Sequence, residues 1–270
     1  MTSGAGLPVR HLTFRRIRIG ILLAILVFTA AWGASTAHRR RSRVEWKRPI
    51  HVGLVLLAPE GAVDAEAWRQ GAARLSDRLT GEMHRYRGSG AVPFEIEVVG
   101  PVAWSGSLPF SAPTSSLADR AWHALDVWRT VRAIDEAARG AAGGFDVRIF
   151  VLATPQPGRQ VEFAEGSGAL NGDVAFVRGS TGGDLDIPLQ VIGHELLHTV
   201  GASDKYDGNG HALEPDGLPD PERVPRHPQI HAEWMAGEVA TAPGRGRLPG
   251  SIDELRVGAT TAREIGWAAR

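Results

Sequence analysis

The chain has 270 residues, 43% of them hydrophobic and 22% charged, which is ordinary for a globular protein with one large domain or two small ones. The 30 basic and 30 acidic residues balance, so no overall field favours nucleic acid or another polyanion as a partner. Cysteine is absent, which excludes a disulfide framework and a thiolate zinc site. Any metal must therefore be held by nitrogen and oxygen atoms.

An uncharged run of 19 residues, Ile19 to Ala37, lies near the N-terminus. Its length is close to the roughly 20 residues of a membrane-spanning helix. Arginines precede it, as in a signal peptide or an anchor, and the small residues 35–37 could form a cleavage site. We therefore assign residues 1–48 to a signal peptide or membrane anchor with basic flanks, and residues 49–270 to the folded domain.

Arginines also follow this run, at positions 39, 40, 41 and 43, and they compete with the preceding ones under the positive-inside rule. We expect a membrane-anchored or secreted protein whose folded domain lies outside the cytoplasm.

The folded domain opens with a strand and a helix. Residues 50–57 are almost continuously apolar, which is typical of a buried central strand. Asp64 is a suitable N-cap, and apolar residues then recur at helical spacing from Trp68 to Tyr86. This pattern predicts an amphipathic helix.

A second strand and helix follow. Apolar and acidic residues alternate over 94–98, which predicts a strand with one solvated face. After a loop over 101–115, residues 116–119 resemble a capping box that opens a helix carrying Trp122 and Trp128. We expect the Trp and Met side chains of both helices to lie in the core.

Three further strands are predicted, at 147–152, 160–163 and 173–177, with the glycine-rich segment 165–168 separating the last two. That segment lacks the Gly-Lys-Ser/Thr ending of a phosphate loop. The elements together predict an α+β fold whose N-terminal part is α/β-like: a mixed, twisted sheet with helices packed on it. The last two strands could form the rim of a cleft to which an extended peptide adds as a strand.

The most informative stretch contains His194-Glu195-x-x-His198. Two histidines four residues apart lie on one face of an α-helix, so both imidazoles can bind one Zn²⁺. Glu195 then points at the open side of the metal. This pattern predicts a zinc-binding helix.

Both ends of this helix are marked in the sequence. Asp186 is the expected N-cap, and Pro188 falls in the first turn, where its missing N–H costs nothing. Gly201 ends the helix, because glycine adopts a left-handed conformation at little steric cost. The chain can thus return Asp204 to the metal as a third ligand. Three protein ligands leave one position open for water, as in catalytic zinc sites.

The motif over residues 194–204, His-Glu-x-x-His-x-x-Gly-x-x-Asp, resembles the zinc signature of the metzincin clan of metallopeptidases, in its variant with aspartate as third ligand. It is similar to snapalysin and to immune inhibitor A-type peptidases, the latter also in the Asp-x-Tyr-Asp ending at 204–207. The resemblance implies a sheet-and-helix part over 49–201 and a smaller C-terminal subdomain over 202–270. It also implies a Met-turn beneath the metal, for which Met235 is the candidate.

The resemblance implies a zinc-dependent endopeptidase that acts on a protein or peptide without a covalent intermediate. Zinc would lower the pKa of its bound water and polarise the scissile carbonyl, while Glu195 takes the water's proton as general base and passes it to the leaving amine. Tyr206 is a candidate donor to the oxyanion, or else a packing residue that supports its loop. The sequence does not indicate which bond is cut.

Two other functions remain open. In a gluzincin-type hydrolase the third ligand is a later glutamate, here Glu233 or Glu238, but the spacing of Gly201 and Asp204 argues against it. In a membrane-tethered binding module without activity the zinc is structural, yet such a site has no use for Glu195. The reserve candidates for third ligand are Asp207 and, more remotely, His211, His227 and His231.

The segment from Asp207 to Pro228 is rich in Gly, Pro and Asp and predicts a loop. Five of its residues could hold a calcium ion, although they do not match the EF-hand spacing: Asp207, Asn209, Glu214, Asp216 and Asp220. Residues 251–254 resemble a capping box that opens a C-terminal helical region.

Overall fold

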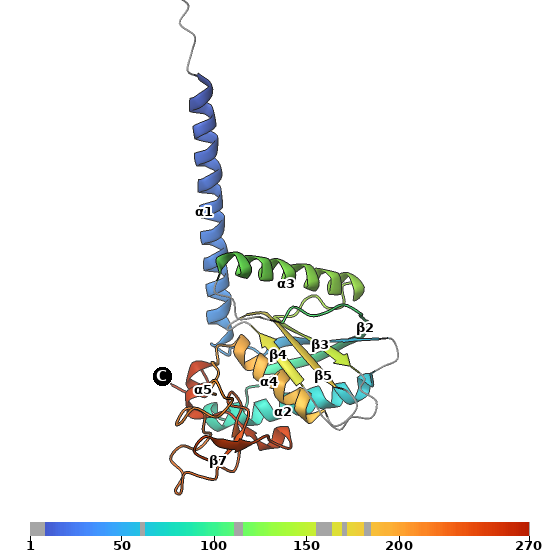
Figure 1. The fold of residues 1–270 in the computed structure, drawn as a ribbon, viewed down its shortest axis with the longest axis vertical. Helices are drawn as coiled ribbons and strands as arrows, with labels where there is room; N and C mark the ends of the chain where they lie inside the picture. Colours follow the sequence, from blue (N-terminus) through green and yellow to red (C-terminus); the bar gives the residue numbers. More distant parts are fainter. Residues whose placement is uncertain are drawn as a thin grey trace, which may run out of the picture. The chain divides into compact units, whose positions relative to one another are not determined.

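The computed structural model describes residues 9–59, 63–110, 116–154, 164–168, 172–180 and 185–269 (Figure 1). The chain divides into two units, residues 1–43 and 44–270. The first contains α1 (Val9–Arg43). The second contains β1 (Ile50–Ala58), α2 (Ala65–Arg87), β2 (Phe94–Ala103), α3 (Leu117–Ala137), β3 (Val147–Thr154), β4 (Ala164–Gly168), β5 (Val174–Ser180), α4 (Asp186–Thr199), β6 (Ala232–Glu233), β7 (Val239–Ala242), β8 (Arg245–Arg247), the 3₁₀-helix η1 (Ile252–Glu254), β9 (Leu255–Arg256) and α5 (Ala259–Glu264).

Helix α1 carries exposed apolar side chains over much of its middle, among them Ile21, Leu26 and Phe28. Among the described residues, no helix has the length and apolar content needed to cross a membrane. The assignment of residues 1–48 to a signal peptide or membrane anchor stays a prediction.

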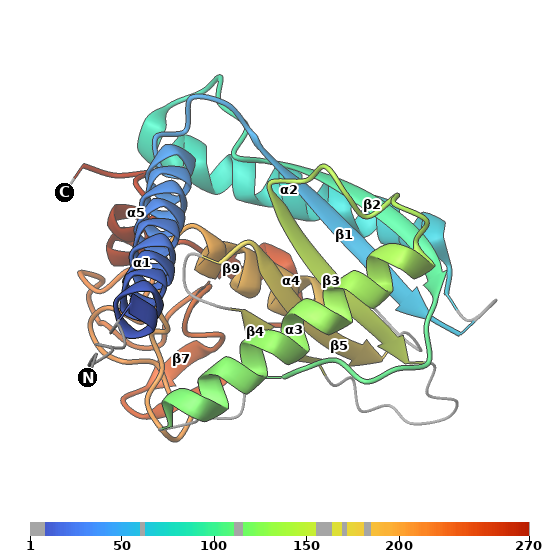
Figure 2. The same ribbon diagram turned by 90° about the horizontal axis from the view of Figure 1, so that it is seen from above.

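The main sheet has the order β2-β1-β3-β5-β4, in which β4 runs antiparallel to β5 and the other neighbours are parallel. A mixed sheet with packed helices is therefore present, as predicted. Alternate residues of β1 enter two cores: Leu54 packs with α2 and α4, and Val55 packs with α3. Figures 1 and 2 show α3 on one side of the sheet and α2 and α4 on the other.

The two predicted helices begin at their predicted caps. Asp64 accepts hydrogen bonds from two backbone N–H groups of α2, and Ser116 does the same for α3. Trp68 is buried in the core as expected, but Trp122 and Trp128 on α3 are 66% and 57% exposed, so that expectation was wrong for them. Helix α3 lies on the outer face of the sheet and buries only one stripe, which includes Ile134, Val127 and Val131.

Two predictions about the sheet need correction. Strand β2 continues through Pro101 to Ala103, and proline is tolerated there because β2 is an edge strand. The segment 165–168, expected to separate two strands, belongs to β4, because pairing with β5 satisfies its backbone. The strand predicted at 160–163 lies outside the described residues.

The C-terminal part consists mainly of loops tied together by short strands and buried side chains. Ser251 caps η1 by accepting from the Asp253 N–H, and α5 follows. Trp46 joins this part to the sheet: its ring packs edge-on against Phe94 and Trp267, and its Nε1–H donates to the Ile265 carbonyl at 2.7 Å. The folded unit thus includes residues before position 49.

Removing residues 1–43 is expected to leave a folded, soluble protein, because that cut keeps Trp46. Removing residues 1–48 should lower the melting temperature by about 10 °C, since losing a buried Trp costs about 3–5 kcal/mol. Circular dichroism melting of both proteins measures the difference. In the 44–270 protein, Lys47→Ala is the control, because its side chain is 82% exposed. Equal melting temperatures would rule out the anchoring role of Trp46.

Candidate metal centre

Helix α4 begins at Asp186, and Leu185 occupies the N-cap position without a side-chain cap. The prediction of Asp186 as N-cap was therefore wrong. Its carboxylate instead pairs with Arg74 of α2 and accepts from the Ile252 N–H at 3.2 Å. These partners are distant in sequence, so the local pattern could not indicate them. Pro188 lies in the first turn, as expected.

A turn at residues 233–237 packs against α4. The Trp234 ring lies so close to Gly193 that any Cβ at position 193 would overlap it. The Trp234 Nε1–H also donates to the Gln190 carbonyl at 3.1 Å. Gly193 therefore lets this turn dock beside the two histidines.

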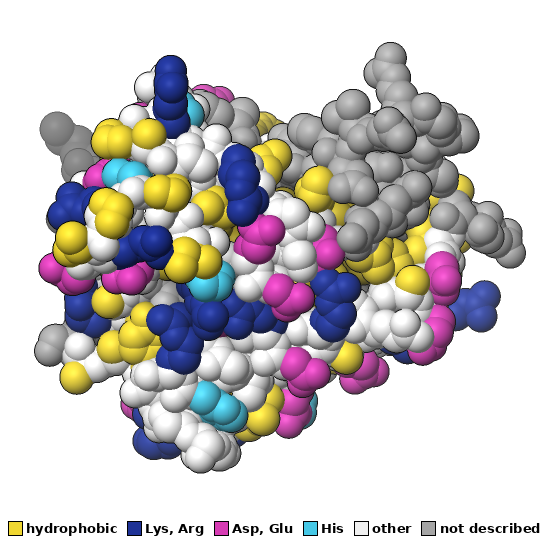
Figure 3. Space-filling view, turned by 90° about the horizontal axis from the view of Figure 1, so that it is seen from below, with side chains coloured by type: hydrophobic (Ala, Val, Ile, Leu, Met, Phe, Trp, Pro, Cys, Tyr) yellow, Lys and Arg dark blue, Asp and Glu magenta, His cyan; other side chains and the backbone are white. Residues whose placement is uncertain are grey.

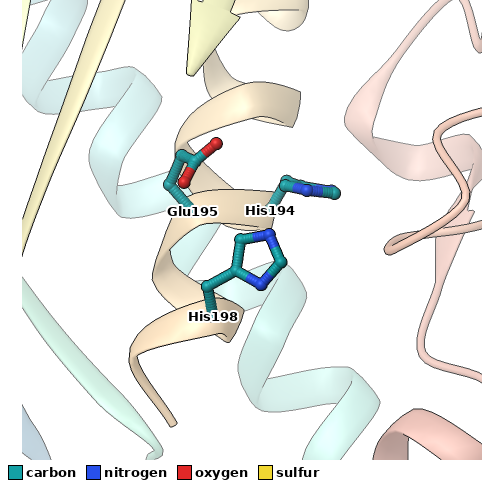
Figure 4. Close-up of side chains that lie close together, drawn as sticks. All are labelled: His194, Glu195 and His198. Carbon is teal, nitrogen blue, oxygen red and sulfur yellow. The ribbon is translucent and has the colours of Figure 1, made fainter. Parts of the chain in front are cut away.

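Each histidine of α4 contacts a backbone carbonyl through Nδ1. His194 Nδ1 lies 3.3 Å from the Trp234 carbonyl oxygen, and His198 Nδ1 lies 2.8 Å from that of Ala202. A carbonyl only accepts, so these contacts place a proton on Nδ1 of each ring and make Nε2, the atom that faces Asp204, the one that could bind a metal. Figure 4 shows both rings and the Glu195 carboxylate projecting from successive turns of the helix.

Asp204 is returned to the histidines by the predicted glycine exit. Gly201 has φ +104°, and α4 ends at Thr199. Asp204 Oδ1 then lies 3.1 Å from His194 Nε2 and 3.2 Å from His198 Nε2. Donor atoms at the corners of a zinc tetrahedron, with bonds of about 2.0–2.1 Å, are about 3.3 Å apart. These two distances are compatible with zinc coordination as well as with hydrogen bonds from the histidines to Asp204.

His194, Glu195 and His198 form a group that could hold a metal ion. Glu195 is 5% exposed, and burial raises the pKa of its carboxyl group. Among the described residues its Oε2 has no hydrogen-bond partner. A buried carboxylate oxygen without a partner needs a ligand or water beside it.

Strand β4 lies directly against Glu195. Any Cβ at position 166 would overlap Glu195 Oε1, so Gly166 lets the edge strand approach the carboxylate. This contact was missed in the sequence, where the glycines read as a loop signal. The one feature of the sequence that relates Gly166 to this contact is its position before α4, the helix that carries the candidate base Glu195.

For Asp204 and His198, hydrogen bonds outweigh burial in setting the side-chain pKa values. Burial would raise the pKa of Asp204, but hydrogen bonds from both histidines hold it well below its usual range. Burial would lower the pKa of His198, but its bonds to Asp204 and to the Ala202 carbonyl raise it. Asp204 is therefore a carboxylate at neutral pH.

Tyr206 stands beside these residues. Its ring stacks on His194 with centroids 6.2 Å apart, and it hydrogen-bonds to Asp204. Burial and the charge of Asp204 raise the pKa of its hydroxyl, which therefore keeps its proton at neutral pH. Tyr206 also lines a cavity of about 380 Å³ with His194 and Glu195, whose apolar walls include Val191, Trp234 and Leu248.

The turn at 233–237 holds Met235, which is fully buried. The buried Glu233 carboxylate accepts from the backbone N–H groups of Met235 and Ala236 and so stabilises the turn. The Met235 carbonyl accepts from the Lys205 N–H at 2.9 Å. The turn is therefore bonded both to α4 and to the loop that carries Asp204.

The reserve ligands have other partners. Asp207 accepts from the N–H groups of Asn209 and His211 and so closes a turn of its own loop. The other reserve histidines and glutamates do not join the group on α4: His211 contacts Glu238, His227 contacts Glu214, His231 lies near Arg256, and Glu233 caps the turn. The group of His194, Glu195 and His198 found among the described residues includes none of the five candidate calcium ligands, nor Asp204, which reaches it through its contacts with the two histidines.

Comparison with known proteins adds no family to this picture: no family model matches the sequence, and no curated protein is significantly similar to it. Functional inference must therefore start from the residues of the site.

Proposed function

We propose that this protein is a zinc-dependent endopeptidase in which His194, His198 and Asp204 hold the metal. The observation that carries the proposal is the convergence of two Nε2 atoms and one carboxylate oxygen beside the buried Glu195, whose Oε2 has no hydrogen-bond partner among the described residues. A purely structural zinc site has four protein ligands and no use for such a glutamate.

The residues around the metal have distinct tasks. Zinc, when bound, supplies a Lewis acid that makes water more acidic and polarises a carbonyl group. Glu195 accepts the proton of the attacking water on its carboxylate and delivers it to the leaving amide nitrogen. Its raised pKa makes it a stronger base than an exposed carboxylate. The Tyr206 hydroxyl, protonated at neutral pH, donates to the carbonyl oxygen as negative charge develops there.

The surroundings support a peptide as substrate. Strand β4 is the last strand in the described sheet and lies beside Glu195, so we expect an extended peptide substrate to lie along it. The adjoining cavity of about 380 Å³ is large enough for one side chain, and Val191 and Leu248 in its walls favour an apolar one.

We further propose that the protein is metzincin-like and that Met235 forms its Met-turn. Burial of Met235 and the bonds from its turn to His194 and Lys205 support this assignment. The gluzincin alternative has less support, because Glu233 and Glu238 bond to backbone N–H groups elsewhere. The N-terminal segment is proposed to direct the domain out of the cytoplasm as a signal peptide or anchor, on the evidence of its sequence.

Metal analysis and a peptide library test the proposed function. The protein is expected to bind one equivalent of zinc, to cleave internal bonds of library peptides, and to lose and regain cleavage on chelation and zinc addition. Mass spectrometry identifies the cleaved bonds. Zinc binding without any cleavage would favour the non-catalytic module, and cleavage insensitive to chelation would refute the proposal.

Gly166→Ala is expected to reduce cleavage at least tenfold, because the new methyl group displaces the Glu195 carboxylate from its position. Protein stability and zinc content should change little, since the atoms that the new methyl group displaces lie at the far end of the flexible Glu195 side chain. The matched control is Gly81→Ala, where the added methyl meets no atom. Unchanged kcat/KM in Gly166→Ala would show that Glu195 tolerates the shift.

A further inference from the structure

A second cavity, of about 500 Å³, shares no lining residue with the cavity at the metal centre. It lies between the end of α2, β9 and the loop 219–231. Arg85, Arg223 and Arg256 line it, against one carboxylate, that of Asp220. On the face of the molecule seen in Figure 3, Lys and Arg side chains gather in a band across the middle.

The buried carboxylate of Glu82 does not neutralise the positive charge of the arginines that line this cavity. Its fully buried carboxylate pairs with Arg78, Arg85 and Arg256 at once. One negative charge is therefore shared among three guanidinium groups. Arg85 and Arg256 keep positive charge on the side that faces the cavity.

Arg223 adds an unused donor. Its Nε is buried and has no hydrogen-bond partner in the described part of the chain. Beside it, burial and the charges of Arg256 and Arg78 lower the pKa of His231. A buried Nε–H without a partner is costly unless an acceptor occupies the adjoining space.

We propose that this cavity binds a small multivalent oxyanion. Its phosphate or carboxylate oxygens accept from the guanidinium groups of Arg85, Arg223 and Arg256, whose planar forks match such oxygens. The volume lies within the range of small-molecule sites. Because the three arginines come from α2, from the loop 219–231 and from β9, the bound anion ties that loop to the rest of the domain. The site is independent of the proposed peptidase activity.

Calorimetric titration of the full-length protein in detergent at low ionic strength tests this site, with inorganic phosphate and succinate as probes. Saturable binding of one equivalent is expected, and the tighter probe identifies the anion as a phosphoryl or a dicarboxylate compound. Arg223→Gln and Arg85→Gln should each weaken binding at least tenfold. Arg245→Gln, an exposed arginine of β8 outside the cavity, should bind as the unaltered protein does.

Thermal unfolding of each variant shows whether it is folded, so that loss of binding is read only from a folded protein. The anion should also raise the melting temperature beyond the effect of sodium chloride at the same ionic strength. Failure of both probes to saturate up to about 10 mM, or equal affinity in Arg223→Gln, Arg85→Gln and the unaltered protein, would overturn the proposal.

Discussion

Replacing Glu195 by alanine is expected to abolish peptide hydrolysis while one equivalent of zinc stays bound. General base catalysis contributes about 10²–10⁴-fold to rate, and Glu195 is a buried carboxylate beside the proposed metal ligands whose Oε2 has no hydrogen-bond partner among the described residues. Metal analysis and kcat/KM on the best library peptide give the two measurements. Full activity in this variant would refute the proposed mechanism.

A second variant, Glu195→Gln, keeps the volume of the side chain and removes its basicity. It should lose activity as completely as Glu195→Ala, because the proton acceptor is lost in both. Glu66→Ala is the matched control, since its exposed carboxylate accepts hydrogen bonds from Arg69 and Gln70 on α2. Retained activity in Glu195→Gln alone would mean that Glu195 orients the water without taking its proton.

Replacing Asp204 by alanine is expected to weaken zinc binding by more than the roughly 10–100-fold that loss of an outer-shell partner costs. Asp204 Oδ1 is within 3.2 Å of both histidine Nε2 atoms, so its removal opens the set of donors. Competition with a chromophoric chelator measures the affinity, and hydrolysis should fall at sub-saturating zinc.

Asp207→Ala is the control for that experiment, because Asp207 lies in the same loop and accepts hydrogen bonds from the backbone of that loop. Its zinc affinity should remain unchanged. If Asp204→Ala keeps its metal under mild chelation while Asp207→Ala loses it, the ligand assignment is reversed.

Local sequence patterns predicted the parts of the fold that depend on local forces. Asp64 and Ser116 cap their helices because their side chains reach N–H groups two and three residues away. Gly201 ends α4 because of its own backbone freedom. Partners distant in sequence determine the other parts. The carboxylate of Asp186, the expected cap, bonds instead to Arg74 and to the Ile252 N–H, and the glycine-rich segment 165–168 forms a strand because it pairs with β5.

The same division holds at the site. Helical periodicity placed His194 and His198 on one face, and the glycine exit brought Asp204 to them, as the spacing predicts. The contacts of Gly193 with Trp234 and of Gly166 with Glu195 carry no local signal, because a glycine that admits a distant side chain looks like any other. Only the folded chain identifies such positions.

The turn at 233–237 has a consequence for how the metal centre is assembled. One of its carbonyls orients His194, the next holds the loop of Asp204, and the buried carboxylate of Glu233 fixes both. The ligands are thus preorganised by contacts that do not involve a metal. Binding of the proposed zinc ion then need not order the chain, unlike zinc binding to a zinc finger, which folds only when metal binds. Removal of the metal by a chelator should therefore abolish peptide cleavage without unfolding the domain.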